Sequence, residues 1–131
     1  KDLEPCTRSQ KILLVEDSES NRLITQIYLE KMGHLTTLAR DGFEAISAFQ
    51  SQDFDLILMD IQMPGLDGLT ATKNIRKSNQ GIPIIAVSAH ILPGDRQRYL
   101  KAGMNDLIAK PFTKCDLQDM INRWTPMVHT G

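Results

Sequence analysis

The sequence predicts a single α/β domain over residues 11–125, in which a parallel sheet is covered by helices on both faces. Three observations support this fold class. Five apolar stretches alternate along the chain with five stretches of helical periodicity. The stretch 56–59 has no polar alternation, as expected for a central strand buried on both faces. The chain has 131 residues, 41% of them hydrophobic, which fits one domain with its own core.

The first third of the chain starts with a polar lead-in over residues 1–10 and a buried strand over 11–15. An acidic pair and a run of helix-capping residue types follow, so a helix should begin near residue 18 and end at Gly33. The apolar residues that recur at helical spacing within it are Leu23, Ile24, Ile27, Tyr28 and Met32. A weaker strand is expected over 34–39. Its apolar anchors are Leu35 and Leu38.

The middle of the chain repeats the alternation of helix and strand. A turn at Asp41-Gly42 precedes a short helix that should end before Asp53. The apolar residues that space this helix are Phe43, Ile46 and Phe49. The central strand then runs over 54–60, and Pro64-Gly65 places a turn shortly after it. A third helix follows, and the residues that carry its spacing are Leu69, Thr72 and Ile75.

The fourth strand is expected over 82–87 and ends at Ser88. A Pro-Gly dipeptide marks the turn into the next helix, because both residues interrupt regular structure. Gly103 should stop this helix, in keeping with the preference for glycine after a helix C-terminus. The apolar side of the helix is expected to carry Tyr99 and Leu100.

The last part of the chain holds a short strand over 107–109, which ends at Lys110-Pro111, and a final helix. Thr113 and Asp116 stand three residues apart, close to the capping-box pattern that starts a helix. The residues that line one face of this helix are Leu117, Met120, Ile121 and Trp124. Residues 126–131 begin with proline, so they should end the helix and form a short tail.

The composition narrows the range of functions. The net charge is −1, so bulk electrostatics give no case for binding nucleic acid or an anionic membrane. No apolar run approaches the ~20 residues of a membrane span, and residues 1–5 lack the apolar core of a signal peptide. Cys6 and Cys115 share no motif, which favours two ordinary thiols over a disulfide or a metal site. Such cysteines fit a reducing, cytoplasmic compartment.

Chemically active residue types follow four of the five expected strands. Glu16 and Asp17 follow the first strand, Asp60 the third, Ser88 the fourth and Lys110 the fifth. Because the carboxyl ends of parallel strands meet at one edge of a sheet, these residues should share a small pocket. Taken alone, each has a plain structural alternative, since acids and serine cap helices or start turns and lysine is usually solvated. Their joint occurrence favours a functional site.

Three carboxylates in one pocket would repel each other unless cations neutralise them. Lys110 supplies one positive charge, and a divalent cation would supply the rest. A set of oxygen ligands without His or Cys favours Mg²⁺, with Mn²⁺ as a substitute. Lysine and hydroxyl groups pair with phosphoryl oxygens, so the pattern indicates phosphoryl transfer to a carboxylate. Asp60 is the expected nucleophile because it follows the most buried strand, and Asp17 and Glu16 would hold the metal.

With four of its motifs, the sequence resembles the receiver domain of two-component response regulators, most closely those of hybrid sensor histidine kinases. The motifs are Ile12–Asp17, Leu58–Gly68, Pro83–Ala89 and Ala102–Phe112. The resemblance covers residues 11–124, nearly the whole chain. It implies a flavodoxin-like (βα)5 fold whose five parallel strands lie in the order 2-1-3-4-5.

The resemblance also implies roles for the site residues. Asp60 would accept a phosphoryl group from a phosphohistidine on a partner. As part of a hybrid histidine kinase, the domain would relay this group to a histidine phosphotransfer domain, so its partners would be a histidine kinase domain, a histidine phosphotransfer domain or both. Asp17, Asp60 and the backbone carbonyl of Gln62 would bind Mg²⁺, while Glu16 would act through a metal-bound water. Such a domain assists its own phosphorylation and dephosphorylation, which leaves open whether it is counted as an enzyme.

Two further roles carry over with the same resemblance. Lys110 would contact a phosphoryl oxygen, and its peptide bond to Pro111 would be cis. Ser88 would swing inward to hydrogen-bond the phosphoryl group and so report its presence. No nucleic acid or membrane contact is implied for the domain itself, although its parent protein could be anchored in a membrane with this domain on the cytoplasmic side.

The sequence departs from the family pattern at two places, and two further positions bear on the lifetime of the phosphoryl group. Leu107 stands where many receivers carry a switching Phe or Tyr, so an aromatic rotamer switch is not expected there. Glu16 replaces the more common Asp, one methylene longer. Gln62 and His90 lie two residues beyond Asp60 and Ser88, where they would flank the phosphoryl group and tune its hydrolysis; a solvated loop His90 is the alternative.

Several functional alternatives remain beside a relay domain of a hybrid kinase. A free-standing regulator that acts by protein–protein binding would have the same core. A haloacid-dehalogenase-like phosphatase would need a second Asp at position 62, where this chain has Gln. A flavin-binding module would need a phosphate-binding loop in place of Glu16-Asp17. A degenerate receiver is disfavoured by the intact acids, Ser88 and Lys110.

Overall fold

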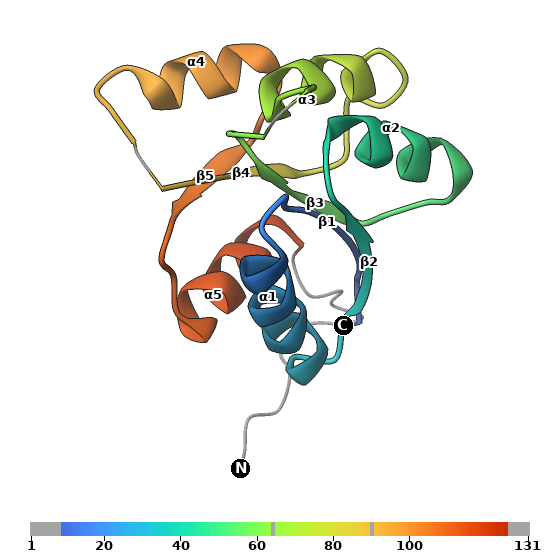
Figure 1. Ribbon diagram of the computed structural model, residues 1–131, viewed down its shortest axis with the longest axis vertical. Helices are drawn as coiled ribbons and strands as arrows, with labels where there is room; N and C mark the ends of the chain where they lie inside the picture. Colours follow the sequence, from blue (N-terminus) through green and yellow to red (C-terminus); the bar gives the residue numbers. More distant parts are fainter. Residues whose placement is uncertain (1–8, 64, 90, 126–131) are drawn as a thin grey trace, which may run out of the picture.

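The computed structural model describes residues 9–63, 65–89 and 91–125. Most of the expected lead-in and the whole tail, together with Cys6 and His90, lie outside these ranges. Five strands and five helices alternate along the described residues (Figure 1). The strands are β1 (Lys11–Val15), β2 (Leu35–Ala39), β3 (Leu56–Asp60), β4 (Ile84–Ser88) and β5 (Asp106–Ala109). The helices are α1 (Glu19–Lys31), α2 (Gly42–Ser51), α3 (Gly68–Arg76), α4 (Asp95–Ala102) and α5 (Lys114–Trp124).

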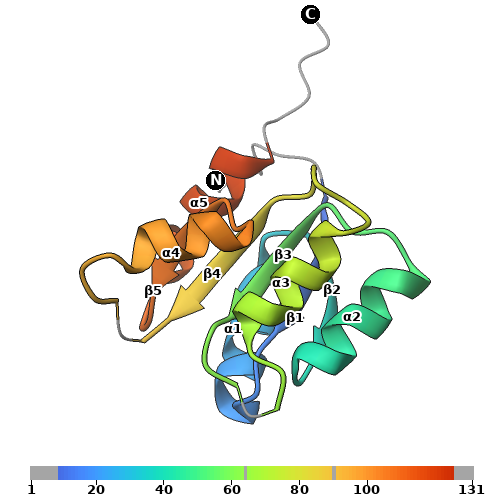
Figure 2. The same ribbon diagram turned by 90° about the horizontal axis from the view of Figure 1, so that it is seen from above.

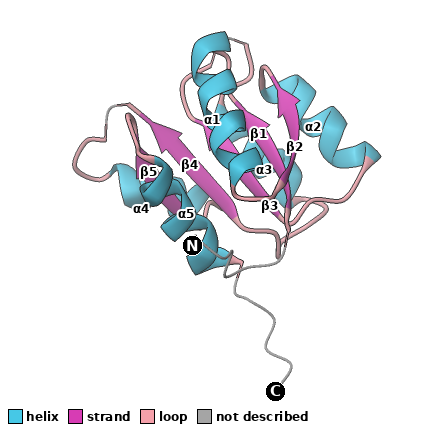
Figure 3. Ribbon diagram, turned by 90° about the horizontal axis from the view of Figure 1, so that it is seen from below, coloured by secondary structure: helices cyan, strands magenta, loops and turns pink. Residues whose placement is uncertain are grey.

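The strands form one parallel sheet in the order β2-β1-β3-β4-β5, which confirms the predicted fold and strand order. Helices α2, α3 and α4 cover one face, in front of the sheet in Figure 2. Helices α1 and α5 cover the other face, in front of the sheet in Figure 3. Each strand is connected to the next by a helix and short loops, which is the crossover connection that parallel strands require.

Strand β3 is the centre of the core, and all five of its residues are buried. Its side chains alternate between two apolar clusters, because successive residues of a strand point to opposite faces. Ile57 and Met59 belong to the cluster under α2, α3 and α4. Leu56 and Leu58 belong to the cluster under α1 and α5. The structure thereby confirms the prediction, made from the unbroken apolar run, that helices cover this strand on both faces.

The register of the sheet brings the carboxyl ends of its inner strands to one edge. Val15 lies beside Met59, Asp60 beside Val87, and Ser88 beside Ala109. The residues that leave these strands therefore emerge next to one another, although they are far apart in the sequence. Four of the helices carry side-chain caps at the same edge, which fixes where each helix starts. The capping residues are Ser18, Asp41, Asp67 and Thr113.

Asp106 joins the last three elements and so fixes the strand that leads to Lys110. Its buried carboxylate accepts hydrogen bonds from Trp124 Nε1 at 2.9 Å, Arg123 Nη1 at 3.0 Å and Arg96 Nη1 at 3.2 Å. Burial alone would raise the pKa of Asp106, but these bonds, the bond from the Leu107 amide and the charge of Arg96 outweigh it and lower the pKa. The bonds tie α4 and α5 to the start of β5.

The buried face of α1 differs from the expectation. Leu23, Ile24 and Ile27 recur at helical spacing, yet they are 56%, 48% and 42% exposed. The residues of α1 that are buried are Thr25 and Leu29. The helix carries more apolar residues than one face can bury, and the face that packs on the sheet is the one centred on Leu29. This leaves an apolar strip on the outer side of α1.

Four other apolar residues are also more exposed than their assigned roles suggest. Leu35 and Leu38, the expected anchors of β2, are exposed because β2 is an edge strand with one neighbour. Phe43 and Leu100 are exposed as well, although Tyr99, the other expected apolar residue of α4, is buried. Local spacing identified the elements correctly, but burial of each side chain depends on which neighbour covers it.

Candidate functional site

Three carboxylates meet at the carboxyl edge of the sheet, as the sequence predicted. Glu16 and Asp17 follow β1, and Asp60 is the last residue of β3. Each offers one oxygen atom, and these three oxygens lie within 4.8 Å of one another. Glu16 and Asp60 are buried, whereas Asp17 is exposed. Oxygen atoms at this spacing can ligate one hard divalent cation, whose charge would offset their mutual repulsion.

Lys110 enters the same site from the end of β5. Its Nζ lies 2.9 Å from Glu16 Oε1 and 3.6 Å from Asp60 Oδ2. The ammonium therefore pairs more closely with Glu16 than with the expected nucleophile. The peptide bond from Lys110 to Pro111 is cis, as the resemblance implied. One ammonium against three carboxylates leaves the site with excess negative charge, which is the electrostatic setting that a divalent cation favours.

The pKa of Asp60 is raised to about 7. Burial of the carboxyl group is the largest cause, because desolvation disfavours its ionised form. The neighbouring Glu16 carboxylate adds to the shift, and the Lys110 ammonium opposes it. In the metal-free protein, the expected nucleophile is consequently protonated in part at neutral pH. A bound cation would favour the ionised, nucleophilic form.

The loop after β3 holds the Asp60 carboxylate from the other side. The Gln62 amide lies 3.3 Å from Asp60 Oδ1 and donates to it. This bond places the Gln62 backbone beside the acidic group, where a carbonyl ligand was expected; the ligand role itself stays a prediction. The chain then turns back, and the Gly68 amide donates to the Ile61 carbonyl at 3.3 Å.

Gly68 touches the backbone of the phosphoacceptor candidate. A Cβ atom on Gly68 would lie 2.2 Å from the Asp60 carbonyl oxygen, too close for any real contact. We expect Gly68→Ala to lower the free energy of unfolding by about 1–3 kcal/mol, because the start of α3 must move away from β3. Urea denaturation would measure this change. The matched control is Gly81→Ala, where the nearest atom, Asn79 Oδ1, is 3.8 Å away. Equal stabilities of the two variants would contradict the expected clash.

Ser88 lies at the same edge, whereas Leu107 lies two residues before the end of β5. Ser88 is buried at the end of β4, and its carbonyl accepts from the Lys110 amide at 2.8 Å. This bond joins the two residues that were expected to hold phosphoryl oxygens. Leu107 packs against the cluster under α2, α3 and α4, so an aliphatic side chain fills the position of the usual aromatic switch. Their signalling roles remain predictions.

Arg22 also contributes to the site, although sequence reasoning did not single it out. Its Nη1 donates to the Glu16 carbonyl at 2.9 Å, and the Ser18 amide lies 3.2 Å from Glu16 Oε2. The signal for Ser18 was present, because it is a helix cap next to an acidic pair. The reach of Arg22 depends on the rotamer of a long side chain, which residue spacing does not encode. In the sequence, Gly68 stood out only as the last residue of the Leu58–Gly68 motif.

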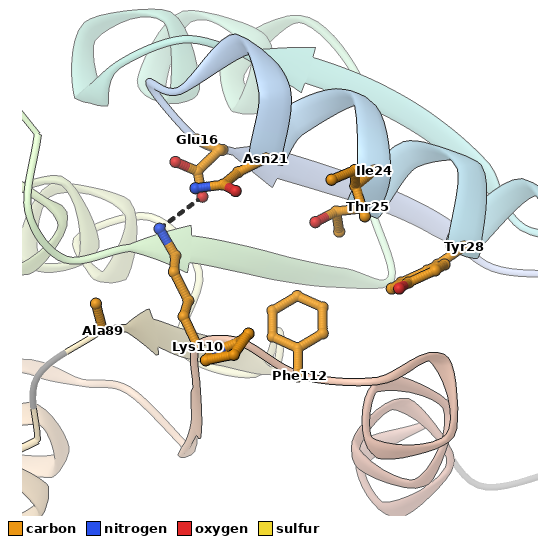
Figure 4. A pocket seen from close by; sticks show the side chains of 9 residues that line it. Glu16, Asn21, Ile24, Thr25, Tyr28, Ala89, Lys110 and Phe112 are labelled. Atoms are coloured by element: carbon orange, nitrogen blue, oxygen red, sulfur yellow. Dashed lines mark ion pairs between the residues drawn. The ribbon is translucent and has the colours of Figure 1, made fainter.

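A pocket of about 420 Å³ opens beside the acidic group, between α1 and the loop after β5 (Figure 4). Glu16 and Lys110 form its polar end, and the dashed line in Figure 4 marks their ion pair. Ile24, Tyr28 and Phe112 line its apolar part. The pocket thus connects the charged site with the apolar strip on the outer side of α1.

None of the helices in the described part of the chain has both the length and the apolar character that a membrane span needs.

The chain matches the family of response regulator receiver domains over residues 12–122. It is 36% identical over 124 residues to the sensor protein GacS of Pseudomonas syringae pv. syringae, an alignment that covers 91% of this chain and 14% of that protein. The chain therefore spans a small part of this relative's length.

Two solved structures extend the comparison. The receiver domain of the sensor histidine kinase PA1611 from Pseudomonas aeruginosa, with a magnesium ion in its active-site cleft, is 43% identical, with a TM-score of 0.84 and coverage of 90% and 98% of the two chains. The co-crystal structure of the Saccharomyces cerevisiae histidine phosphotransfer protein Ypd1 with the Ssk1 receiver domain contains a chain that is 30% identical, with a TM-score of 0.83 and coverage of 89% of each chain.

Proposed function

Because the chain belongs to the response regulator receiver domain family, we propose that Asp60 accepts a phosphoryl group from a phosphohistidine in a reaction that requires Mg²⁺. The observation that carries this proposal is the meeting of Glu16, Asp17 and Asp60 around one possible cation position, with Lys110 beside them. The magnesium ion in the related PA1611 receiver supports the choice of metal. Mn²⁺ should substitute, since the ligands are all hard oxygens.

Four groups would hold the metal: the carboxylates of Asp17 and Asp60, the backbone carbonyl of Gln62, and Glu16 through a water molecule. The bound cation supplies charge neutralisation for the carboxylates and the phosphoryl oxygens. Asp60 then attacks phosphorus; the new O–P bond forms as the P–N bond to the donor histidine breaks, and the imidazole leaves with its electron pair and takes up a proton. Such catalysis relies on positioning and electrostatics.

Lys110 and Ser88 would contact the phosphoryl group once Asp60 carries it. The Lys110 ammonium lies between Glu16 and Asp60, so a small movement away from Glu16 would bring it to a phosphoryl oxygen. Ser88 ends the neighbouring strand, and its hydroxyl would donate to a second phosphoryl oxygen. The backbone bond between these two residues keeps both strand ends at a fixed separation.

The partner is proposed to be a histidine phosphotransfer domain or the kinase domain of a hybrid sensor kinase. Two comparisons support this choice: GacS is a sensor protein, and Ypd1 binds a receiver similar to this chain. The exposed strip of Leu23, Ile24 and Ile27, together with the pocket lined by Phe112, offers an apolar surface beside Asp60 on which a partner helix could dock. A free-standing regulator remains the second candidate. We place the reaction in the cytoplasm, where kinase domains hold ATP.

Incubation with acetyl phosphate tests the proposal. We expect intact-mass spectrometry to find a single phosphoryl adduct that requires Mg²⁺ and disappears with EDTA. Asp60→Asn should remove the adduct, because its amide is no nucleophile towards phosphorus. The control Asp53→Asn, an exposed site at the other end of β3, should retain it. An equal adduct on Asp60→Asn would show that another residue accepts the group.

A further inference from the structure

Arg22 reaches from α1 to the loop that carries two of the acidic residues. Its Nη1 donates to the Glu16 carbonyl at 2.9 Å in a partly buried contact. We propose that Arg22 is a positioning residue for the divalent cation, which holds the peptide between Glu16 and Asp17 so that Asp17 faces Asp60. This inference rests on the proposed function, because it assumes that the three carboxylates bind Mg²⁺.

Asp17 is the acidic residue whose position most needs support. Glu16 and Asp60 are buried, and Asp60 belongs to a strand that is paired on both sides. Asp17 is exposed and lies in the short loop between β1 and α1. Without a cation, the repulsion from the two other carboxylates would favour its movement into solvent. Its placement within reach of their oxygens therefore depends on how the loop backbone is held.

The loop backbone is held at three successive points. The Glu16 amide donates to the Ala39 carbonyl at 3.0 Å, and the Ser18 amide donates to Glu16 Oε2 at 3.2 Å. Arg22 binds the atom between them, the Glu16 carbonyl. Since a peptide unit is planar, the direction of this carbonyl also fixes the position of the Asp17 Cα. The Arg22 bond is thus the contact that orients the peptide leading to Asp17.

Arg22 is itself well placed to act as a fixed support. Its amide donates to the Ser18 carbonyl at 2.8 Å in the first turn of α1, and its guanidinium is planar and rigid. The charge of Arg22 and its hydrogen bond have opposite effects on the cation. The positive charge disfavours Mg²⁺ nearby, whereas the ordered loop favours Mg²⁺ by holding its ligands ready. The sign of the change on removing Arg22 therefore separates the two roles.

Two measurements on the whole 131-residue chain test the inference: isothermal titration with MgCl₂, and thermal unfolding without metal. Both are made on the wild type, on Arg22→Met and Arg22→Lys, and on the control Lys31→Met. Lys31 is exposed at the far end of the same helix, so its variant changes charge by the same amount. We expect Arg22→Met to bind Mg²⁺ about tenfold more weakly, as is typical when a group that orients a ligand is removed. Arg22→Lys should recover part of the affinity, and Lys31→Met should match the wild type.

Tighter Mg²⁺ binding by Arg22→Met would overturn the inference, because Arg22 would then act only as a nearby cation. An unchanged affinity with a lower melting temperature would also overturn it, because the contact would then serve α1 alone. If Arg22→Met does not fold, Arg22→Lys decides. Its Mg²⁺ affinity would overturn the inference if it equals or exceeds that of the wild type. A wild-type chain that binds no Mg²⁺ would instead refute the proposed metal site.

Discussion

Replacing Asp60 by asparagine is expected to stabilise the metal-free protein at pH 8 by roughly 2–4 kcal/mol. The pKa of Asp60 is raised to about 7 by burial and by the Glu16 carboxylate, so its ionised form is unfavourable in the folded state. Asparagine keeps the size of the side chain and removes the charge. Lys110 keeps its closer partner, Glu16, in this variant. A gain in stability from changing a functional residue is the mark of a site whose repulsion is relieved only by its ligand.

The stability difference between Asp60→Asn and the wild type should also depend on pH. The unfolded carboxyl group loses its proton near pH 4, whereas the folded one keeps it to about pH 7. Between these values the folded state binds the extra proton, so the stability supplied by this proton is full below pH 4 and is lost as the pH rises through 7. The advantage of Asp60→Asn over the wild type should therefore grow from pH 5 to pH 8. Urea denaturation across this range measures it.

Asp53→Asn is the matched control, because Asp53 is exposed and lies at the end of β3 away from the acidic group. Its stability should follow the wild type at every pH. If Asp60→Asn were less stable than the wild type at pH 8, the repulsion inferred among the three carboxylates would be wrong.

The second expected result is a loss of Mg²⁺ affinity at acid pH. Metal ligands must be deprotonated, and Asp60 is the buried carboxyl group with a pKa of about 7. We expect the apparent affinity for Mg²⁺ to fall roughly tenfold from pH 8 to pH 6, as the ionised fraction of Asp60 falls by that factor. Isothermal titration at several pH values, with release of a proton on binding near pH 6, would establish the linkage.

The same titration on Asp60→Asn provides the control. This variant lacks one charged ligand, so it should bind Mg²⁺ more weakly at pH 8. It should also lose most of the change in affinity between pH 6 and pH 8, because the group that titrates there has gone. An affinity of the wild type that stays constant over this range would contradict the assignment of Asp60 as the titrating ligand.

The sheet and most of the site could be predicted because strong local signals and one topological rule were enough. The apolar run before Asp60 identified β3, and parallel strands with short helical crossovers place their carboxyl ends at one edge. Glu16, Asp17 and Lys110 follow strands of that sheet, so their meeting with Asp60 required no knowledge of side-chain conformation. Repulsion among the acids then pointed to a divalent cation.

Features that depend on packing and on long side chains could not be predicted in the same way. The face of α1 that packs on the sheet is set by its fit to the other elements, and the helical spacing of Leu23, Ile24 and Ile27 did not reveal that they are exposed. The pairing of Lys110 with Glu16 and the contact of Arg22 with the Glu16 carbonyl depend on rotamers. The roles of Ser88 and Leu107 concern a phosphorylated state and stay predictions.

The central claim is that Asp60 is the residue that carries the phosphoryl group. The most direct test is to phosphorylate the chain with acetyl phosphate and Mg²⁺, reduce it with sodium borohydride, which converts an acyl phosphate into an alcohol, and sequence its peptides by tandem mass spectrometry. We expect homoserine at position 60, and only in samples that contained both acetyl phosphate and Mg²⁺. Homoserine at position 17, or an acid converted at any other position while Asp60 stays intact, would contradict it.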